Sequence, residues 1–414
     1  MRLRIAYIAH QYLPEHVGGT EVFTHGLARR AIDAGHDVVV LSGEECPSPY
    51  PRDFVPRQWV YEGVPVIAFP YNLSVAPDIA RYEYDNPFIA AQVQDTLASW
   101  APDVVHVTHA MKVTGASVRA CQLLGVRTVV TLSDFWFLCP RHTLLTWDNR
   151  VCDGPSAWEE CLRCEQDLHG IGGRRKDRRA MQDRSTYLRE TLLDADRIIA
   201  LSSFLARMFV ANGYAADRLE VIPHGIEPSI LRSPEPSPGP TRLVFIGSVI
   251  ESKGVHVVIG AIRSMPTLDV RLMIHGPARD TDPYVREVKS MIAGDERIVF
   301  AGRFAPENLG DVLAATDFLV LPSLCYDNEP LVVKQARHVG IPVIVSDVGS
   351  LIDMVDDDVD GWRVAANDEV AWRAAITRAV DARAGGRHWV SRPQPSMDDH
   401  YAAVEDIYQE LVKS

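Results

Sequence analysis

Residues 318–345 contain the pattern that most restricts the fold of this chain. An apolar run at 318–321 leads into the polar loop 323–329, a helical pattern that begins at Pro330, and a second apolar run at 342–345. Short apolar strands joined by a helix pair in parallel, because the helix returns the chain to the same edge of the sheet. The pattern therefore predicts a parallel sheet with helices on its faces.

The same alternation of apolar runs and helical patterns extends through most of the 414 residues. Strands buried on both faces give such near-continuous apolar runs. Further runs that we expect to form strands occur at 3–9, 38–41, 104–107, 128–132, 198–201, 219–222, 243–246, 270–274 and 298–300. Residues 58–69 instead carry two β-rich runs around Glu62-Gly63, which indicates an inserted hairpin. The sequence therefore predicts an α/β fold.

Residues 227–240 interrupt this alternation. They are rich in proline and serine and show little periodicity, which is typical of a linker, and the chain is too long for one ordinary core. We therefore expect two Rossmann-like, doubly wound domains with a ligand cleft between the carboxyl edges of their sheets. The expected segments are a first domain at 1–228, a linker at 229–240, a second domain at 241–395 and a terminal helix at 396–414.

The composition restricts the partners and the compartment. The chain carries 42 Lys and Arg against 55 Asp and Glu, and this net charge of −13 argues against a nucleic-acid partner, which requires a basic face. No stretch has the roughly 18 uncharged apolar residues of a membrane-spanning helix, and residues 1–15 resemble a strand more than a signal peptide. Seven cysteines fit a reducing compartment. We expect a cytoplasmic protein.

Two loops after expected strands have features of phosphate sites. Gly18 and Gly19 precede a helical pattern and lack side chains that would keep a phosphate from the backbone N–H groups; a tight turn without a ligand is the alternative. Lys253, followed by Gly254, offers a positive charge to a phosphate; a solvated lysine is the alternative. The helix expected at Pro330 adds free N–H groups and the positive end of its dipole.

The loop before that helix ends in Asp327, Asn328, Glu329, Pro330 and Leu331. The Asp327 carboxylate can accept hydrogen bonds from sugar hydroxyls, and Gln335, eight positions later, can accept one from a ribose. Backbone N–H groups of the loop can hold a sugar or a phosphate. Simple loop and capping roles are the alternative.

Polar side chains also follow two expected strands of the first domain. His109 comes soon after the run at 104–107, and Ser133 and Asp134 follow the run at 128–132. The carboxyl ends of parallel strands meet at one edge, so His109 can hydrogen-bond a phosphate or a sugar there and Ser133 can hydrogen-bond a sugar hydroxyl beside Asp134. A histidine with a purely structural role is the alternative.

Four of the seven cysteines fall in one loop-like insertion, at about 136–172. They form the spacing C-x12-C-x8-C-x2-C, and they are Cys139, Cys152, Cys161 and Cys164. Four thiolates can coordinate a zinc ion tetrahedrally, and such a site would stabilise a segment that has little hydrophobic core of its own. Four free thiols, disulfides or an iron–sulfur cluster are the alternatives. Because four sulfur ligands leave no open position, we expect a structural zinc and no catalytic metal.

Residues 173–179, GRRKDRR, begin a helical pattern with a run of positive charge. A basic helix start can contact an anionic membrane surface or a charged acceptor, and a solvated helix face is the alternative. Peripheral contact with the inner face of the membrane is therefore one open expectation.

Together these motifs resemble those of retaining, two-domain glycosyltransferases of the family 4 type, in the subset with a cysteine-bearing insertion. The matching motifs are Gly18-Gly19, Ser133-Asp134, V-I-P-H-G at 221–225, Lys253-Gly254 and the block 327–349. The resemblance covers nearly the whole chain. It implies the GT-B fold, in which two Rossmann-like domains face each other across a cleft and the last helix crosses back to the first domain.

The resemblance also implies an activity of the hexosyltransferase type. Lys253 and the helix start at Pro330 would hold the diphosphate of a nucleotide-sugar donor, Asp327 would hold the sugar, and Gln335 the ribose. The sugar would pass, with retention of its anomeric configuration, to an unknown acceptor that is a small molecule, a glycan or a lipid-linked molecule.

Three positions depart from the family pattern. The family usually has a second carboxylate where Gln335 stands, an arginine at Ser248 and a histidine at Ser133. Arg303, after another expected strand, is the candidate to replace the missing charge. The departures leave two alternatives: a degenerate protein that binds a sugar nucleotide or a partner without turnover, and a nucleotide-sugar epimerase or hydrolase on the same fold.

Overall fold

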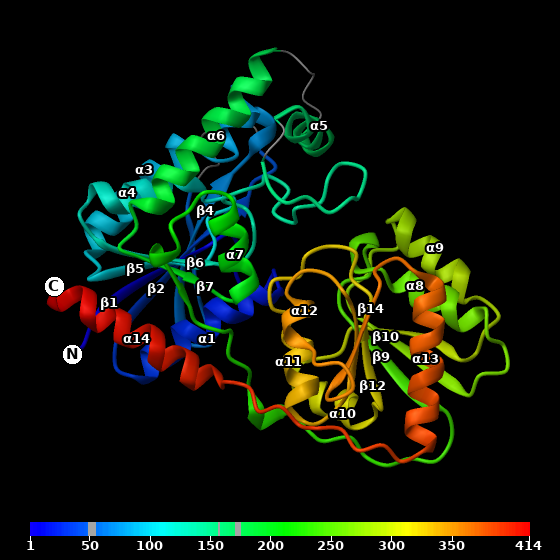
Figure 1. Ribbon diagram of the computed structural model, residues 1–414. Coiled ribbons are helices and arrows are strands. Elements are labelled where there is room, and N and C mark those ends of the chain that lie inside the picture. The colour runs from blue at the N-terminus through cyan, green and yellow to red at the C-terminus, as the bar shows by residue number, and fades with distance from the viewer. Residues whose placement is uncertain (49–54, 156–157, 170–174) are drawn as a thin grey trace. The chain divides into compact units, whose positions relative to one another are not determined.

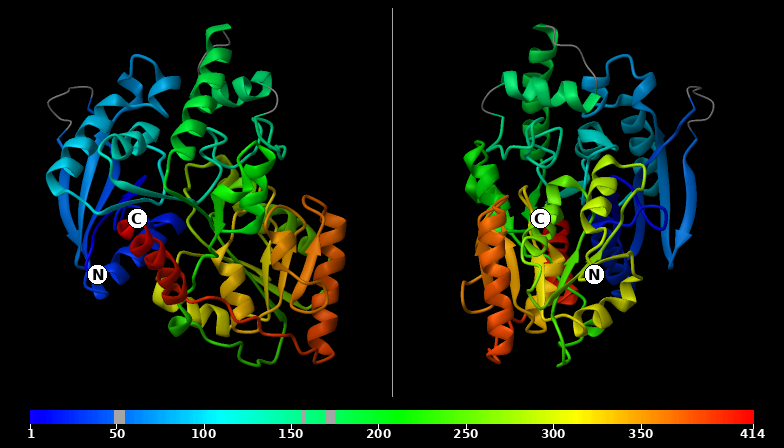
Figure 2. Two further views of the ribbon diagram at one scale, coloured as in Figure 1. Left: turned by 60° about the vertical axis from the view of Figure 1, so that its left-hand side comes forward. Right: turned by 90° about the vertical axis from the view of Figure 1, so that its right-hand side faces the viewer.

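The computed structural model describes residues 1–48, 55–155, 158–169 and 175–414. The chain divides into two compact units, each an α/β structure with helices around one sheet (Figures 1 and 2). Unit 1 comprises Met1–His224 and Met397–Ser414, and unit 2 comprises Gly225–Ser396. Among the described residues, no helix is both long and apolar enough to cross a bilayer.

The sheet of unit 1 has the strand order β3-β4-β2-β1-β5-β6-β7-β8. Its strands are β1 (Arg4–Ala9), β2 (Asp37–Glu45), β3 (Arg57–Tyr61), β4 (Val64–Tyr71), β5 (Val104–Val107), β6 (Arg127–Leu132), β7 (Arg197–Ala200) and β8 (Leu219–Val221). Neighbouring strands are parallel except for β3 and β4, which form the predicted antiparallel hairpin. The strand order reverses between β1 and β5, from which the chain winds toward both edges.

The core of unit 1 includes helices from opposite ends of the sequence. Its described helices are α1 (Gly19–Asp33), α2 (Ile79–Tyr82), α3 (Pro87–Trp100), α4 (Thr114–Leu123), α5 (Trp158–His169), α6 (Arg175–Leu193), α7 (Ser203–Ala211) and α14 (Met397–Lys413). Phe23 and Leu27 of α1 share one buried cluster with Val404 and Tyr408 of α14. The last helix is therefore an integral part of unit 1.

His106, within β5, links α14 to the sheet. Its side chain is fully buried, its Nδ1 lies within hydrogen-bonding distance of the Tyr408 hydroxyl, and its Nε2 lies 2.7 Å from Thr131 Oγ1. Burial, with a smaller contribution from His400, lowers the pKa of His106 to about 3. His106 is thus a neutral structural histidine at neutral pH.

Unit 2 has a parallel sheet with the order β11-β10-β9-β12-β13-β14. Its strands are β9 (Thr241–Ile246), β10 (Val270–His275), β11 (Ile298–Gly302), β12 (Phe318–Leu321), β13 (Val343–Ser346) and β14 (Gly361–Val364). The order reverses between β9 and β12, the arrangement of a doubly wound sheet. The two parallel-sheet units confirm the predicted fold class.

The helices of unit 2 connect these strands. They are α8 (Val255–Arg263), α9 (Pro283–Ile292), α10 (Leu309–Ala314), α11 (Leu331–His338), α12 (Leu351–Met354) and α13 (Glu369–Ala384). The sequence pattern did not predict β14, which starts at a glycine. A Cβ on Gly361 would lie 2.1 Å from the Val343 carbonyl oxygen, so the close pairing of β14 with β13 requires this residue.

Residues 229–240, expected as a linker, belong to unit 2. The Glu235 N–H group donates to the Ala314 carbonyl at 2.8 Å, and the Arg242 guanidinium donates to the Glu235 carbonyl at 2.7 Å. The segment has one 3-10 turn at Pro228–Ile230 and is otherwise irregular, and these hydrogen bonds join it to the end of α10 and to β9. The boundary between the units lies earlier, between His224 and Gly225.

The buried histidine of β5 predicts a pH dependence of stability. The unfolded chain takes up a proton at His106 near its ordinary pKa of 6.5, whereas the folded chain does so only near 3. The free energy of unfolding should therefore fall as the pH drops from 6.5, by up to about 1.4 kcal/mol per pH unit from this residue. His106→Gln should remove that part of the slope, as measured by urea unfolding between pH 7 and 5. The exposed control His388→Gln should keep it; equal slopes in all three proteins would contradict the assignment.

Candidate functional site

The first candidate site lies where the strand order of unit 2 reverses. β9 and β12 are adjacent and parallel, so the loops that follow them leave the sheet at the same edge. The loop after β9 contains Lys253, and the loop after β12 contains Asp327. In open α/β sheets, ligands bind outside the carboxyl ends of the strands at such a reversal.

Glycine allows these two loops to pack closely. The Leu324 N–H group donates to the Ser252 carbonyl at 2.8 Å. Gly254 has a φ of +66°, and a Cβ there would lie 2.0 Å from the Pro322 carbonyl oxygen. Any other residue at 254 would both strain the backbone and push the loops apart. The glycine of the Lys253-Gly254 pair is therefore a packing requirement of the site.

Lys253 and Asp327 form an ion pair, and the Ser323 hydroxyl also donates to the Asp327 carboxylate. The two side chains of the pair are 24% and 10% exposed. Burial acts to lower the pKa of Lys253, but the negative charge of Asp327 outweighs it and the pKa is raised. The structure thus brings together the residue predicted to hold the diphosphate and the residue predicted to hold the sugar.

The helix beside this pair begins without a capping side chain. Helix α11 starts at Leu331, one residue later than predicted, because Pro330 adopts an extended conformation as the N-cap. The Pro330 side chain makes no capping hydrogen bond, and the first N–H groups of the helix point toward the loop that contains Asp327. The Glu329 carboxylate instead pairs with Lys334 at 3.0 Å, and Lys334 is 2% exposed. Sequence reasoning missed Lys334, since a lysine in a helix usually faces solvent.

The other residues predicted for the donor site occupy different places. Gln335 is half-buried on α11, and Asn328 is half-buried in the preceding loop. Ser248 is half-buried just after β9. Arg303 is exposed after β11, an edge strand that β10 separates from β9, so strand order does not make its loop a neighbour of the Lys253 loop.

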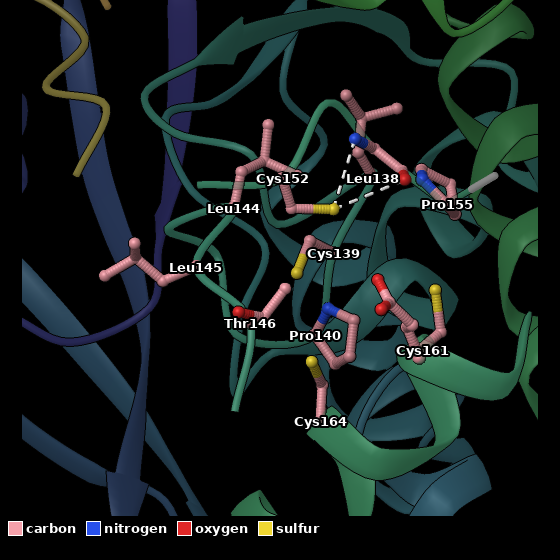
Figure 3. A pocket seen from close by; sticks show the side chains of 12 residues that line it. Leu138, Cys139, Pro140, Leu144, Leu145, Thr146, Cys152, Pro155, Cys161 and Cys164 are labelled. Atoms are coloured by element: carbon pink, nitrogen blue, oxygen red, sulfur yellow. Dashed lines mark hydrogen bonds between the residues drawn. The ribbon is translucent and has the colours of Figure 1, made fainter. Parts of the chain in front are cut away.

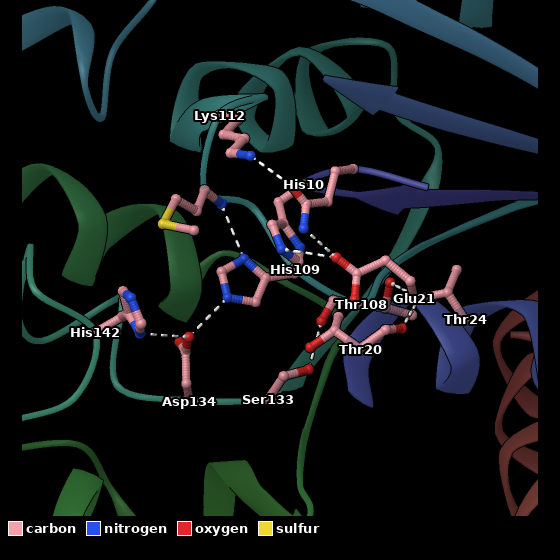
Figure 4. Close-up of polar contacts among 12 residues, drawn as sticks. His10, Thr20, Glu21, Thr24, Thr108, His109, Lys112, Ser133, Asp134 and His142 are labelled. Atoms are coloured by element: carbon pink, nitrogen blue, oxygen red, sulfur yellow. Dashed lines mark hydrogen bonds and ion pairs between the residues drawn. The ribbon is translucent and has the colours of Figure 1, made fainter. Parts of the chain in front are cut away.

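A second polar cluster lies at the strand-order reversal of unit 1. The loops after β1, β5 and β6 carry His10, His109 and Asp134, and these strands are neighbours in the sheet. Figure 4 shows their side chains pointing toward one another. The imidazole rings of His10 and His109 have centroids 4.4 Å apart. The topology therefore gathers three chain segments into one polar cluster.

His109 is held in one tautomer. The Met111 N–H group donates to its Nδ1 at 3.1 Å, so neutral His109 carries its proton on Nε2, which lies 2.8 Å from Asp134 Oδ2. Asp134 Oδ2 also lies 3.5 Å from His142 Nδ1, and Asp134 Oδ1 accepts from the Trp136 N–H group at 2.8 Å. Burial acts to raise the pKa of Asp134, but His109, His142 and this N–H group lower it to about 2. Asp134 is therefore a carboxylate across the physiological pH range.

Glu21 holds the other side of the cluster. His10 Nε2 lies 3.1 Å from Glu21 Oε1, and the Gln11 amide donates to the same oxygen. Burial and the nearby His109 lower the pKa of His10 to about 4, so His10 is neutral at pH 7. Among the described residues, His10 Nδ1 is buried without a hydrogen-bond partner. Lys112 donates to Gln11, which brings a positive charge to the same edge.

The glycines predicted as a phosphate site lie at the start of α1. Gly18 is the N-cap of the helix and Gly19 is its first residue, with no capping side chain from Gly18. Glu21 Oε2 lies 2.6 Å from the position of a Cβ on Gly18, whereas space is open at Gly19. A carboxylate of the protein therefore already lies beside the first glycine, and a ligand phosphate would meet it there.

Ser133, the third residue predicted in unit 1, donates its hydroxyl to the Thr108 carbonyl at 2.6 Å. Sequence reasoning missed His10, Glu21, Lys112 and His142. The polar pair His10-Gln11 directly after the first strand was the available signal. No sequence signal indicated His142, because it comes close to Asp134 only through a hydrogen-bonded turn of the cysteine-bearing loop.

The four cysteines of the predicted zinc site line one small cavity of about 40 Å³ (Figure 3). Cys164 is buried and the other three are partly buried. Within the described part of the chain, no three His, Cys, Asp or Glu side chains are already arranged to hold a metal ion. Of the basic segment 173–179, residues 173–174 and the side chains of 175–178 lie outside the described residues.

Comparisons with known proteins agree with this architecture. The family model Glycosyltransferase Family 4 matches residues 17–230, and Glycosyl transferases group 1 matches residues 240–382. Glycogen synthase of Mycobacterium tuberculosis is 27% identical over 400 residues, which cover 92% of this chain and 86% of the relative.

Solved structures show the same fold. Sucrose-phosphate synthase from Thermosynechococcus elongatus has a TM-score of 0.68 at 16% identity, with 99% of this chain and 96% of that chain covered. Anabaena HepE in complex with UDP-glucose has a TM-score of 0.64 at 16% identity, with 100% and 99% covered. Since the first family model spans more than half of the chain, the protein belongs to Glycosyltransferase Family 4 and is a glycosyltransferase with the GT-B fold.

Proposed function

We propose that this glycosyltransferase takes its sugar from a nucleotide-diphosphate sugar bound by unit 2. The observation that carries the proposal is the ion pair of Lys253 and Asp327 at the strand-order reversal, in the loops that lead to the starts of α8 and α11. A cation and free N–H groups suit a diphosphate, and a carboxylate suits sugar hydroxyls. Anabaena HepE, which shares the fold, has been solved with UDP and UDP-glucose.

Donor binding would redistribute the contacts of Lys253. Its ammonium group has three N–H donors, and the ion pair with Asp327 leaves donors for a diphosphate oxygen. Asp327 keeps acceptor capacity for a sugar hydroxyl, and Gln335 would accept from the ribose. The Ser350 hydroxyl, which donates to the Asp327 carbonyl at 2.6 Å, holds the loop in place before the donor arrives.

The reaction breaks the bond between the anomeric carbon and the diphosphate oxygen, and the electron pair leaves with the diphosphate. Lys253 and the N–H groups of α11 would stabilise the negative charge that develops on that oxygen. The acceptor hydroxyl oxygen forms the new bond to the anomeric carbon, and its proton passes to an oxygen of the departing phosphate. We propose that the anomeric configuration is retained, in keeping with the family resemblance.

The polar cluster of unit 1 would bind hydroxyl groups of the acceptor. The buried His10 Nδ1 can accept a hydrogen bond, and the Asp134 carboxylate fixes the orientation of His109. A reducing, cytoplasmic location fits the seven cysteines of the chain, and any contact with the membrane would come from the basic segment 173–179.

The proposal is tested by titrating the protein calorimetrically with UDP-, GDP- and ADP-sugars. Saturable binding of a donor with release of free nucleoside diphosphate supports transfer. Binding without release would indicate the degenerate alternative, and interconversion of the sugar nucleotide would indicate an epimerase. If no donor binds, the assignment of unit 2 fails.

Replacing Lys253 should weaken donor binding. A hydrogen bond between charged groups contributes about 1.5–3 kcal/mol, so Lys253→Ala should raise the Kd for the donor about 10- to 100-fold. The control Lys289→Ala removes a half-exposed lysine of α9 in the same unit and should leave the Kd unchanged. Equal affinities for the wild type and Lys253→Ala would remove Lys253 from the site.

Replacing Asp134 should separate positioning from donor binding. Asp134→Asn removes the negative charge between His109 and His142, so we expect kcat to fall about 10-fold or more while the donor Kd stays constant. The exposed residue Asp95 of α3 supplies the control Asp95→Asn, for which both constants should match the wild type. An unchanged kcat in Asp134→Asn would show that the cluster is only structural.

The stereochemistry can be read directly. Proton NMR of the product should show the same anomeric configuration as in the donor sugar. A product of opposite configuration would contradict retention but would leave the donor site of unit 2 intact.

A further inference from the structure

The cysteine-bearing insertion brings thiols from three chain segments to one cavity. Cys139 lies in the turn after β6, Cys152 follows a small hairpin, and Cys161 and Cys164 lie one turn apart on α5. All four line the same cavity of about 40 Å³, and Figure 3 shows their side chains around it. The remaining walls include Leu138, Leu144 and Leu145, which shield the thiols from water.

Hydrogen bonds fix the position of each segment. Leu145 and Val151 form an antiparallel bridge, and the Cys152 N–H group donates to the Leu144 carbonyl at 2.8 Å. The Cys139 N–H group donates to the Phe135 carbonyl, also at 2.8 Å. These contacts define where two of the sulfur atoms lie before any ligand binds.

Ion pairs hold α5 against the loop. Arg141 pairs with Asp167 at 2.5 Å, and Arg150 lies 3.6 Å from Glu160. The helix that carries Cys161 and Cys164 is therefore anchored near both ends to the segment that carries Cys139 and Cys152. Cysteines three apart on a helix lie on the same face, so both can turn toward the cavity.

Hydrogen bonds with Gly154 hold the Cys152 thiol within its own turn. The Gly154 N–H group lies 3.4 Å from Cys152 Sγ, and Gly154 has a φ of +123°. The Cys152 thiol also donates to the Gly154 carbonyl at 3.4 Å, so this turn defines the position of the sulfur. Gly154 meets a second constraint as well, because a Cβ there would lie 2.0 Å from the Asn212 amide oxygen.

We propose that Cys139, Cys152, Cys161 and Cys164 bind one Zn²⁺ ion as a structural site. Each thiol releases its proton to solvent, and four Zn–S bonds of about 2.3 Å form. The described side chains are not yet grouped for a metal, so binding would draw α5 and the loop together around the cavity. Four sulfur ligands leave no position for substrate, so the ion takes no part in group transfer.

The zinc site would stabilise the turn that carries His142. Within this turn the Phe135 N–H group donates to the His142 carbonyl at 3.2 Å, and the His142 N–H group donates to the Cys139 carbonyl at 2.9 Å. Cys139 and His142 thus share one hydrogen-bonded turn, and His142 lies beside Asp134. A metal that fixes Cys139 fixes the approach of His142 to the polar cluster of unit 1.

Metal analysis of the full-length protein tests the proposal. Protein purified without chelator should contain about one zinc ion per chain by inductively coupled plasma mass spectrometry. Exchange for Co²⁺ should give the strong near-ultraviolet charge-transfer bands of thiolate ligands and the visible bands of tetrahedral Co²⁺. Removal of zinc should lower the melting temperature, and added Zn²⁺ should restore it.

Paired variants separate this cluster from the other thiols. Cys161→Ser with Cys164→Ser should lose the zinc and the cobalt bands. Cys46→Ser makes the same chemical change at a partly buried cysteine outside the cluster and should keep both. If the double variant does not fold, the metal content and cobalt spectrum of the wild type still decide the question. Zinc-free, folded wild type, disulfides among these four cysteines, or iron with an absorbance near 400 nm would overturn the proposal.

Discussion

Both candidate sites depend on the reversal of strand order within a parallel sheet. At the reversal, two adjacent strands send their connections to opposite sides, so no helix covers the edge between them. In unit 2 this edge carries Lys253 and Asp327, and in unit 1 it carries His10 and His109. The strand order therefore determines where the two candidate sites lie, and the side chains in the loops determine what each site can bind. Replacing one loop could change the ligand without changing the fold.

The sequence predicted the features that depend on local order. The alternation of apolar runs and helices gave the α/β fold and most strands, and the β3–β4 hairpin followed from its turn. Lys253, Asp327 and the start of α11 were each predicted from their places after strands. β14 was missed because its pattern is short and begins with Gly361, whose role depends on the neighbouring strand. The composition of the segment 229–240 gives no sign of the hydrogen bond that joins it to α10.

Contacts across long sequence separations account for the rest of the site. The partners Lys253 and Asp327 are 74 residues apart, and Lys112 and Gln11 are 101 apart. The spacing of residues along the chain does not indicate such pairs. The sequence therefore predicted Lys253 and Asp327 as site residues but did not predict the ion pair between them. His142 is a different case, because it is near Asp134 in sequence and yet nothing in its neighbouring residues indicates that its side chain lies beside that carboxylate. The turn that contains both Cys139 and His142 places His142 beside Asp134.

The return of α14 to unit 1 has a consequence for how the chain can be rearranged. Unit 2 is an insertion within unit 1, and its two ends lie side by side: the Ile226 N–H group donates to the Pro395 carbonyl at 3.0 Å, and Ile226 bridges Ser396. If unit 2 were expressed alone, a short linker could connect its two ends. If unit 2 were inserted into another protein, both of its ends would attach at one position on that protein's surface. Unit 2 could therefore be exchanged as a whole during evolution while unit 1, which contains the polar cluster, stays unchanged.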